Sequence, residues 1–305
     1  MGRWFRWGLG GVAGLAGLVG LLTAGVWLRA GWQLDRRFEV PANPVALRSD
    51  AAALAQGRYL FNTLGCGGCH GTDGAGKVMW QSGSNRLVAS HIAPGPGSVT
   101  QGYRPVDWVR TVRHGVRPDG RGLLGMPSID FNRLSDDDLG ALVGYIVQLP
   151  AVDADPGRHT LGLLLRAAVG LGRMPLAPER IDHSLPPAAA VTAAVNVDHG
   201  RYVAQTCVGC HGADLRGGSI PGMPPGTPPA ADLTPGPGKA LDRYVDAGAF
   251  RAMFKTGRRP DGSAVAVMPF PTLSQLNETD TAALYMFLRS LPPVTAASGA
   301  GSRGG

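Results

Sequence analysis

Two short segments contain the residues of this chain that can carry cofactor chemistry. Residues 66–71 read CGGCHG and residues 207–212 read CVGCHG, and together they use all four cysteines of the sequence. Two cysteines separated by two residues and followed directly by histidine form the attachment motif of c-type haem. The spacing lets each thiol form a thioether with one haem vinyl group and holds the histidine beneath the iron. We therefore predict two covalently bound haem c groups, with thioethers at Cys66, Cys69, Cys207 and Cys210 and proximal iron ligands at His70 and His211.

Three other uses of a Cys-x-x-Cys pair agree less well with the sequence. A structural zinc site built from two such pairs usually brings them within about 15–20 residues of each other, whereas these two pairs lie 141 residues apart. A thioredoxin-like redox pair needs no histidine after the second cysteine and belongs to a βαβ context that the sequence lacks. Two cysteines three residues apart also pair poorly as a disulfide. Haem attachment accounts for both copies.

The sixth iron ligand must come from elsewhere in each copy, and methionine is the candidate. Met126 lies 56 residues after the first motif histidine, Met268 lies 57 residues after the second, and each is followed by proline. The same dipeptide occurs at 174–175 and 223–224, but only Met126 and Met268 occupy the same place in both copies. A His/Met pair leaves the iron six-coordinate, without an open position, and raises its potential.

The cysteine motif is part of a longer internal repeat. Three further matches recur at offsets of 142 or 143 residues: GRY at 57–59 and 200–202, RPDG at 117–120 and 259–262, and LP at 149–150 and 291–292. His114, an alternative ligand in the first copy, is replaced by Thr256 in the second. We predict an N-terminal anchor, a first domain, a linker, a second domain and a disordered tail, at residues 1–32, 50–150, 151–191, 192–294 and 295–305.

Each copy has the pattern helix, loop, helix, turn, helix. The second helix covers about 106–114 in one copy and 247–256 in the other. The last helices begin at Ser135 and Asn277, each a capping residue three positions before an acid, and apolar residues then recur at helical spacing. No stretch shows convincing strand alternation. The predicted fold class is all-α, with two tandem domains preceded by one transmembrane helix.

The N-terminal segment has the features of a membrane span. Residues 8–28 are an uncharged run of 21 residues, about 31 Å as a helix, which matches the hydrocarbon core of a bilayer. Trp4 and Trp7 precede this run, and Trp27 and Trp32 lie at its other end, as in an interfacial aromatic belt. The alternative is a cleaved signal peptide, whose apolar region is usually about 7–15 residues. Both interpretations export the rest of the chain, to the periplasmic side of a bacterial cytoplasmic membrane.

The linker contains an apolar stretch, 161–176, which is interrupted by Arg166 and Arg173 and is too short for a second span. Packing across the two domains is one interpretation of this stretch, and contact with the membrane surface is the other.

Composition narrows the class of protein. Charged residues are 17% of the chain and cysteines number only four, which excludes a highly charged disordered chain and a disulfide-dense scaffold. The net charge of +7 includes arginines that crowd the first copy near Arg110. These side chains could steer an acidic redox partner, pair with haem propionates or simply be solvated. Nucleic acid is not expected as a partner of an exported protein.

These motifs resemble class I cytochrome c domains. The whole pattern is most similar to the membrane-anchored multihaem cytochromes that serve as electron-transfer subunits of bacterial periplasmic dehydrogenases. The resemblance covers both copies and rests on the Cys-x-x-Cys-His motifs with Met126-Pro127 and Met268-Pro269, and on the loop 232–235. The alcohol and gluconate dehydrogenase subunits typically carry three such domains and pass electrons to ubiquinone. This chain has two, so quinone reduction is not carried over.

The resemblance implies an electron carrier without catalytic residues of its own. Such a carrier would pass electrons from a periplasmic or membrane donor, such as a dehydrogenase, to a respiratory acceptor, either a terminal oxidase or a soluble cytochrome. An alternative is a dihaem peroxidase, but that chemistry needs an iron that can free a coordination site, and matched methionines argue against it. A haem-based sensor or assembly module is a third possibility, for which no additional signalling domain is visible.

Overall fold

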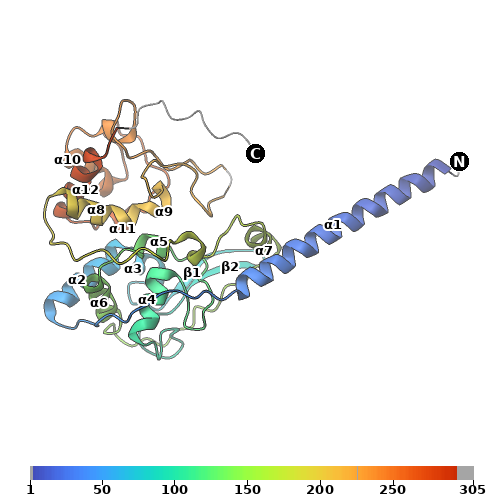
Figure 1. Cartoon of the computed structure of the whole chain (residues 1–305), viewed down its shortest axis with the longest axis horizontal. Coiled ribbons are helices and arrows are strands. Elements are labelled where there is room, and N and C mark those ends of the chain that lie inside the picture. The colour runs from blue at the N-terminus through green and yellow to red at the C-terminus, as the bar shows by residue number, and fades with distance from the viewer. Residues whose placement is uncertain (1–2, 225, 294–305) are drawn as a thin grey trace.

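The computed structural model describes residues 3–224 and 226–293, with side chains described from Ala13 onward. The predicted tail at 295–305 lies outside these residues, and so do the side chains of Trp4 and Trp7. The first element is α1 (Arg3–Asp35), a helix of 33 residues that projects away from the rest of the molecule (Figure 1). Its portion Ala13–Asp35 is long and apolar enough to cross a membrane. The predicted span therefore lies inside one longer helix.

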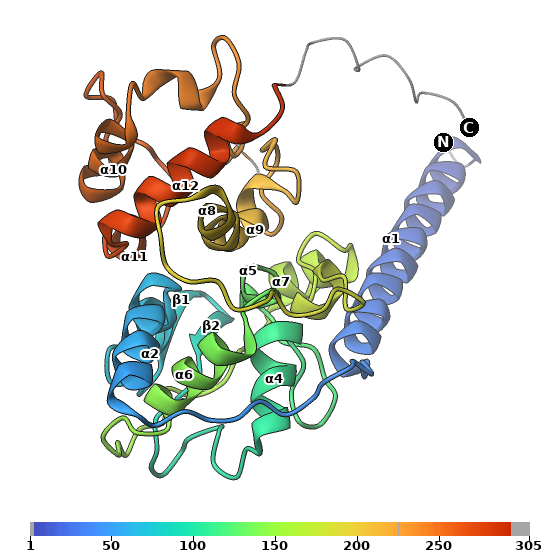
Figure 2. The same ribbon diagram turned by 60° about the vertical axis from the view of Figure 1, so that its left-hand side comes forward.

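Two helical units follow, joined by a linker that runs between them (Figure 2). The first unit contains α2 (Ala51–Thr63), α3 (Cys66–His70), β1 (Lys77–Ser82), β2 (Asn85–Ala89), α4 (Pro105–His114), α5 (Ser128–Phe131) and α6 (Asp136–Ile146). The linker contains α7 (Leu163–Gly170) and the 3₁₀ turn η1 (Ala177–Arg180). The second unit contains α8 (Val197–Ala204), η2 (Gln205–Cys207), α9 (Val208–His211), η3 (Ala240–Arg243), α10 (Ala247–Thr256), α11 (Phe270–Leu273) and α12 (Glu278–Ser290).

The helix ends follow from local chemistry that the two units share. Ser135 Oγ accepts a hydrogen bond from the Asp138 N–H at 3.1 Å, and Asn277 Oδ1 accepts one from the Asp280 N–H at 2.8 Å. These contacts satisfy N–H groups that a helix leaves without an internal partner, and they confirm the two predicted caps. Helices α4 and α10 both end at a glycine in the left-handed region, Gly115 with φ 65° and Gly257 with φ 69°, a conformation that glycine adopts without steric cost.

Each unit has its own apolar core, built on one pair of crossing helices. Helix α2 packs on α6 in the first unit, and α8 packs on α12 in the second. The glycines of the repeated GRY segments lie at these crossings. A Cβ atom at Gly57 would lie 2.1 Å from the Ala141 carbonyl oxygen, and one at Gly200 would lie 1.9 Å from that of Ala283. Backbone therefore meets backbone in both units, and this close approach explains why the repeat has glycine there.

The prediction of an all-α protein is wrong for one segment. Strands β1 and β2 form an antiparallel hairpin in which Ser82 pairs with Asn85, across a two-residue loop that contains Gly83 at φ 54°. Every residue of β1 is exposed, so its sequence has no buried face to produce an alternating apolar pattern. Strand β2 gains a further backbone pairing from the linker, since Arg86 and Thr160 exchange two hydrogen bonds of 2.8 Å.

The apolar linker stretch packs mainly on α1 and the first unit. Val169 and Leu176 form a small buried cluster with Ala30 of α1 and with Leu124. The expectation that this stretch packs across the two units is therefore wrong for these apolar side chains. Their partners are Ala30 of α1 and Leu124 of the first unit.

Candidate haem sites

The two motif histidines have the same environment in the two units. His70 Nδ1 lies 2.7 Å from the Ser90 carbonyl oxygen, and His211 Nδ1 lies 2.8 Å from that of Ala231. Burial lowers the pKa of both imidazoles, which favours the neutral ring. A neutral imidazole that donates through Nδ1 keeps the lone pair of Nε2 for a metal. Both histidines are thus oriented as iron ligands would be, and this orientation fits the haem that the motif implies.

The cysteines lack the lowered pKa of a reactive redox pair, although Cys210 is exposed to solvent. Burial raises the pKa of Cys66 and of Cys207 to about 12, and it also raises the pKa of Cys69 and Cys210. A reactive thioredoxin-like pair has a lowered pKa instead. Within residues 3–224 and 226–293, no group of three or more His, Cys, Asp or Glu side chains is arranged to hold a metal ion.

The two predicted methionine ligands are presented by the same local structure. Met126 and Cys66 both pack against the core of the first unit, and Met268 and Cys207 both pack against the core of the second. In each case the carbonyl of the methionine accepts a hydrogen bond of 2.9 Å from the N–H two residues later, which closes a tight turn around the proline. The pairing of each methionine with its histidine across a haem stays a prediction.

His114, the alternative iron ligand, contacts a histidine of the linker instead. Its Nδ1 lies 2.9 Å from His183 Nδ1 of the linker, and burial, together with that neighbour, lowers the pKa of His114 to about 4. The ring therefore faces another histidine.

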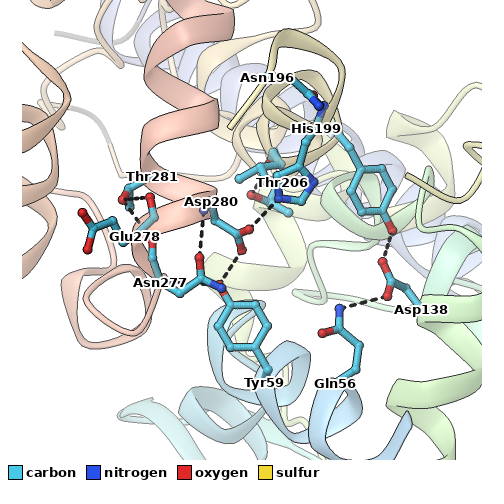
Figure 3. A network of polar contacts seen from close by, with 12 residues as sticks. Gln56, Tyr59, Asp138, Asn196, His199, Thr206, Asn277, Glu278, Asp280 and Thr281 are labelled. Atoms are coloured by element: carbon cyan, nitrogen blue, oxygen red, sulfur yellow. Dashed lines mark hydrogen bonds and ion pairs between the residues drawn. The ribbon is translucent and has the colours of Figure 1, made fainter. Parts of the chain in front are cut away.

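The two units meet through a reciprocal pair of tyrosines, which the sequence reasoning missed (Figure 3). Tyr59 of α2 donates to Asp280 of α12 and accepts the Asn277 N–H at 3.2 Å. Tyr202 of α8 donates to Asp138 of α6 and accepts the Ser135 N–H at 3.1 Å. These tyrosines belong to the repeated GRY segments, and the carboxylates belong to the two helix caps. The recurrence of GRY was the available signal, but nothing in it names a partner.

Each aspartate also has a donor from its own unit. Gln56 Nε2 lies 3.0 Å from Asp138 Oδ1, and His199 Nε2 lies 2.7 Å from Asp280 Oδ1. Gln56 and His199 stand at the same place in the repeat. The interface therefore relates the two units by an approximate twofold symmetry, with a cavity of about 110 Å³ between them.

The same interface brings each cysteine motif next to the other unit. The Gly209 N–H, inside the second motif, donates to Asp130 Oδ1 of α5 at 2.6 Å, and its carbonyl accepts from Arg180 at 2.7 Å. The residue of α11 that corresponds to Asp130 is Thr272, and a Cβ atom at Gly68 of the first motif would lie 3.5 Å from its Oγ1. The short helix after each predicted methionine ligand thus contacts the haem-attachment segment of the opposite unit.

Asp130 makes this interface asymmetric in charge. Burial raises its pKa to about 7, although the Gly209 N–H and the Arg180 guanidinium both favour the ionised form. The first motif has only the neutral Thr272 in the corresponding place. Asp130 was not among the sequence-predicted site residues, because its role depends on a segment 79 positions away.

Comparison with protein families agrees with the repeat. Residues 52–146 match the model described as cytochrome c oxidase, cbb3-type, subunit III, and residues 197–292 match the model described as cytochrome c. The two matched segments contain one Cys-x-x-Cys-His motif each.

Curated relatives extend the likeness over most of the chain. It is 27% identical over 277 residues to the fructose dehydrogenase cytochrome subunit of Gluconobacter japonicus, which covers 83% of this chain and 55% of the relative. It is also 27% identical over 280 residues to the alcohol dehydrogenase (quinone) cytochrome c subunit of Komagataeibacter europaeus, at 82% and 58% coverage. The chain thus spans little more than half the length of these relatives. With a cytochrome c match on each repeat, this protein is a c-type cytochrome with covalent haem attachment, similar to the electron-transfer cytochrome subunits of dehydrogenases.

Proposed function

We propose that this protein is a membrane-tethered dihaem cytochrome that carries electrons from a periplasmic dehydrogenase to a respiratory acceptor. The observation that carries the proposal is the matched pair of motif histidines, each with Nδ1 bound to a backbone carbonyl and Nε2 left for a metal. A single such histidine is compatible with many roles. Two in the same setting, each directly after a Cys-x-x-Cys pair, support one haem per unit.

The residues that hold each haem follow from the repeat. Cys66 and Cys69 provide the thioethers of the first unit, with His70 and Met126 as axial ligands. Cys207, Cys210, His211 and Met268 take these roles in the second unit. The bound haem supplies one-electron redox chemistry, and the protein supplies position, burial and ligation. The carbonyls of Ser90 and Ala231 orient the histidines, and the methionine sulfur favours the reduced iron.

The proposed organisation is an anchor at 1–32, cytochrome c domains at 50–150 and 192–294, a linker at 151–191 and a tail at 295–305. The contacts of Asp130 with Gly209 and of Thr272 with the first motif support an arrangement in which both attachment segments adjoin one interface. An electron carrier with two redox centres needs them close to each other, and the reciprocal Tyr–Asp contacts hold the units in that arrangement.

The relatives support a dehydrogenase as the electron donor, since two of them are cytochrome subunits of a fructose and an alcohol dehydrogenase. The acceptor in this proposal is a terminal oxidase or a soluble cytochrome. The length and apolar composition of α1 support a single membrane span. In this proposal both haem domains lie on the periplasmic side of a bacterial cytoplasmic membrane.

The test uses the full chain purified from membranes. A pyridine haemochrome assay should give two haem c per chain, and affinity capture from mildly solubilised membranes should recover a dehydrogenase that reduces both haems when its substrate is added. One haem per chain, or turnover of peroxide by the reduced protein, would overturn the proposal. Retention in carbonate-washed membranes checks the span by itself.

A further inference from the structure

A small apolar surface lies where α1 meets the rest of the molecule. Helix α7 packs directly on the C-terminal part of α1, beside the first unit (Figures 1 and 2). A Cβ atom at Gly170 would lie 2.3 Å from the Val26 carbonyl oxygen, and the Arg166 guanidinium lies 4.3 Å from the centre of the Trp27 ring. Ala30 and Val169 are buried in this contact. Helix α7 is therefore attached to residues 26–31 of α1.

The opposite face of α7 is apolar and open. Leu164 is 76% exposed and Leu171 is 62% exposed. Leu171 is the C-cap residue directly after α7. It follows Leu164 by seven positions, so the two side chains lie on the same side of the helix, away from Val169 and Gly170. Leu163 beside them is also exposed, as are Leu28 and Trp32 of α1. We refer to Leu28, Trp32, Leu163, Leu164 and Leu171 as the α7 foot.

The position of the α7 foot along α1 indicates what covers it. The apolar run of α1 ends near Leu28, and Trp27 and Trp32 mark the depth at which tryptophan prefers to sit between hydrocarbon and water. Helix α7 contacts α1 at this same level. Leucines earlier in the span, among them Leu18, Leu21 and Leu22, are also exposed, and a bilayer would cover them. A lipid surface is therefore the occupant that the geometry favours over a protein partner.

Basic side chains surround the foot. Arg29 of α1 and Arg173, just after α7, are both exposed, and Arg166 keeps its guanidinium on the Trp27 ring. Arginine near a bilayer places its apolar stem in the boundary region and its charge among the headgroups. Leucines on one face with basic residues beside them are the pattern of a helix that lies in the membrane interface.

We propose that α7 lies in the outer interface of the bilayer with its leucines embedded, as a second membrane contact beside α1. This inference depends on the proposed membrane span of α1. Leu176, which follows α7, is buried in the same cluster as Leu124 of the first unit. The first unit would therefore be held at a defined orientation to the membrane. A single helical tether alone would leave it free to tilt. The foot would thereby decide which face of the haem domains a partner can reach.

The experiment uses the haem-loaded full chain in vesicles of phosphatidylethanolamine and phosphatidylglycerol. Leu164→Cys is labelled with an environment-sensitive NBD fluorophore, and Val245→Cys in the second unit, where the native side chain is 88% exposed, is the matched control. The label at residue 164 should emit at a shorter wavelength than the label at residue 245, and its fluorescence should be quenched less by iodide in solution. It should be quenched by lipids that carry a nitroxide near the headgroup end of the acyl chain. This is the quenching expected about 5–10 Å into the headgroup and acyl boundary.

A label at 164 that iodide quenches as strongly as it quenches the label at 245 would overturn the inference, and Leu171→Cys repeats the measurement if the first variant folds poorly. Two controls separate this failure from failure of the proposed function. Loss of the parent chain from carbonate-washed membranes would refute the α1 span. Labelling of the parent chain without an added cysteine would show free motif thiols, and so refute haem attachment.

Discussion

Tyr59 donates its hydroxyl hydrogen to the carboxylate of Asp280, which lies 221 residues later in the chain. Tyr202 makes the corresponding contact with Asp138 in the opposite direction. Burial raises the pKa of both tyrosines, so both hydroxyls stay protonated and act as donors. Each carboxylate therefore belongs to a helix cap of one unit and accepts from the tyrosine of the other, and the two units are joined by the same chemistry used twice.

Removal of one of these hydroxyls should weaken the interface. Tyr59→Phe removes one hydrogen-bond donor from Asp280 but leaves His199. We therefore expect the free energy of unfolding to fall by about 1.5–3 kcal/mol, the range for a hydrogen bond to a charged group. Tyr202→Phe should cost a similar amount, since Gln56 remains on Asp138. Urea unfolding of the haem-loaded protein measures both. Tyr145→Phe is the control, because that ring packs edge-on against Phe61 inside the first unit. Equal losses in all three variants would contradict an interfacial role.

Asp130 should make stability depend on pH near neutrality. Its pKa is raised by burial from the ordinary 3.8 to about 7, so between these values the folded state binds more protons than the unfolded state. Stability therefore falls as pH rises from about 4 to 7. Asp130→Asn stays neutral and should remove this fall, which amounts to at most about 4 kcal/mol. Unfolding at pH 5 and at pH 8 is the measurement. The exposed Asp182→Asn is the control, and a pH dependence unchanged in Asp130→Asn would refute the assignment.

Met126→Ala should open one iron to an external ligand. Without its sixth ligand the haem of the first unit should bind carbon monoxide and lose potential, because methionine sulfur favours the reduced iron. Met268→Ala should do the same in the second unit. Visible spectra under carbon monoxide and a redox titration test both. Met223→Ala, which alters an exposed methionine also followed by proline, should leave both haems unchanged. A spectrum unaffected by Met126→Ala would exclude that ligand.

The close helix crossings should not tolerate a methyl group. In Gly57→Ala the new Cβ would lie 2.1 Å from a backbone oxygen of α6, so α2 and α6 must separate. We expect a loss of about 1–3 kcal/mol, the usual cost of overpacking. Gly200→Ala should behave alike in the second unit. Thermal unfolding reports the effect, with Gly248→Ala in α10 as the control, where a Cβ meets only the Asp246 side chain within 3.4 Å. No loss at Gly57 would contradict this explanation of the repeated glycine.

Features that depend on neighbouring residues could be predicted from the amino-acid sequence. The Cys-x-x-Cys-His motifs name the cofactor because five consecutive residues carry its attachment chemistry. The helix caps at Ser135 and Asn277 join residues three positions apart in the sequence. The hydrogen bonds that close the turns at Met126 and Met268 join residues two positions apart. The internal repeat then distinguished Met126 and Met268 from the other methionines, because only these two occupy equivalent positions in the two copies. Local chemistry and repetition were sufficient for the fold class of most of the chain and for the proposed haem ligands.

Contacts between distant segments depend on the folded arrangement of the whole chain. The hairpin of β1 and β2 escaped prediction because β1 is exposed throughout and has no apolar alternation. Contacts such as Tyr59 with Asp280, Asp130 with Gly209, and α7 with α1 link residues that are far apart in the sequence. A single sequence records which residues could make a contact, but the partner is selected by the packing of whole helices. The position of each haem-attachment segment against the opposite unit is therefore a property of the fold.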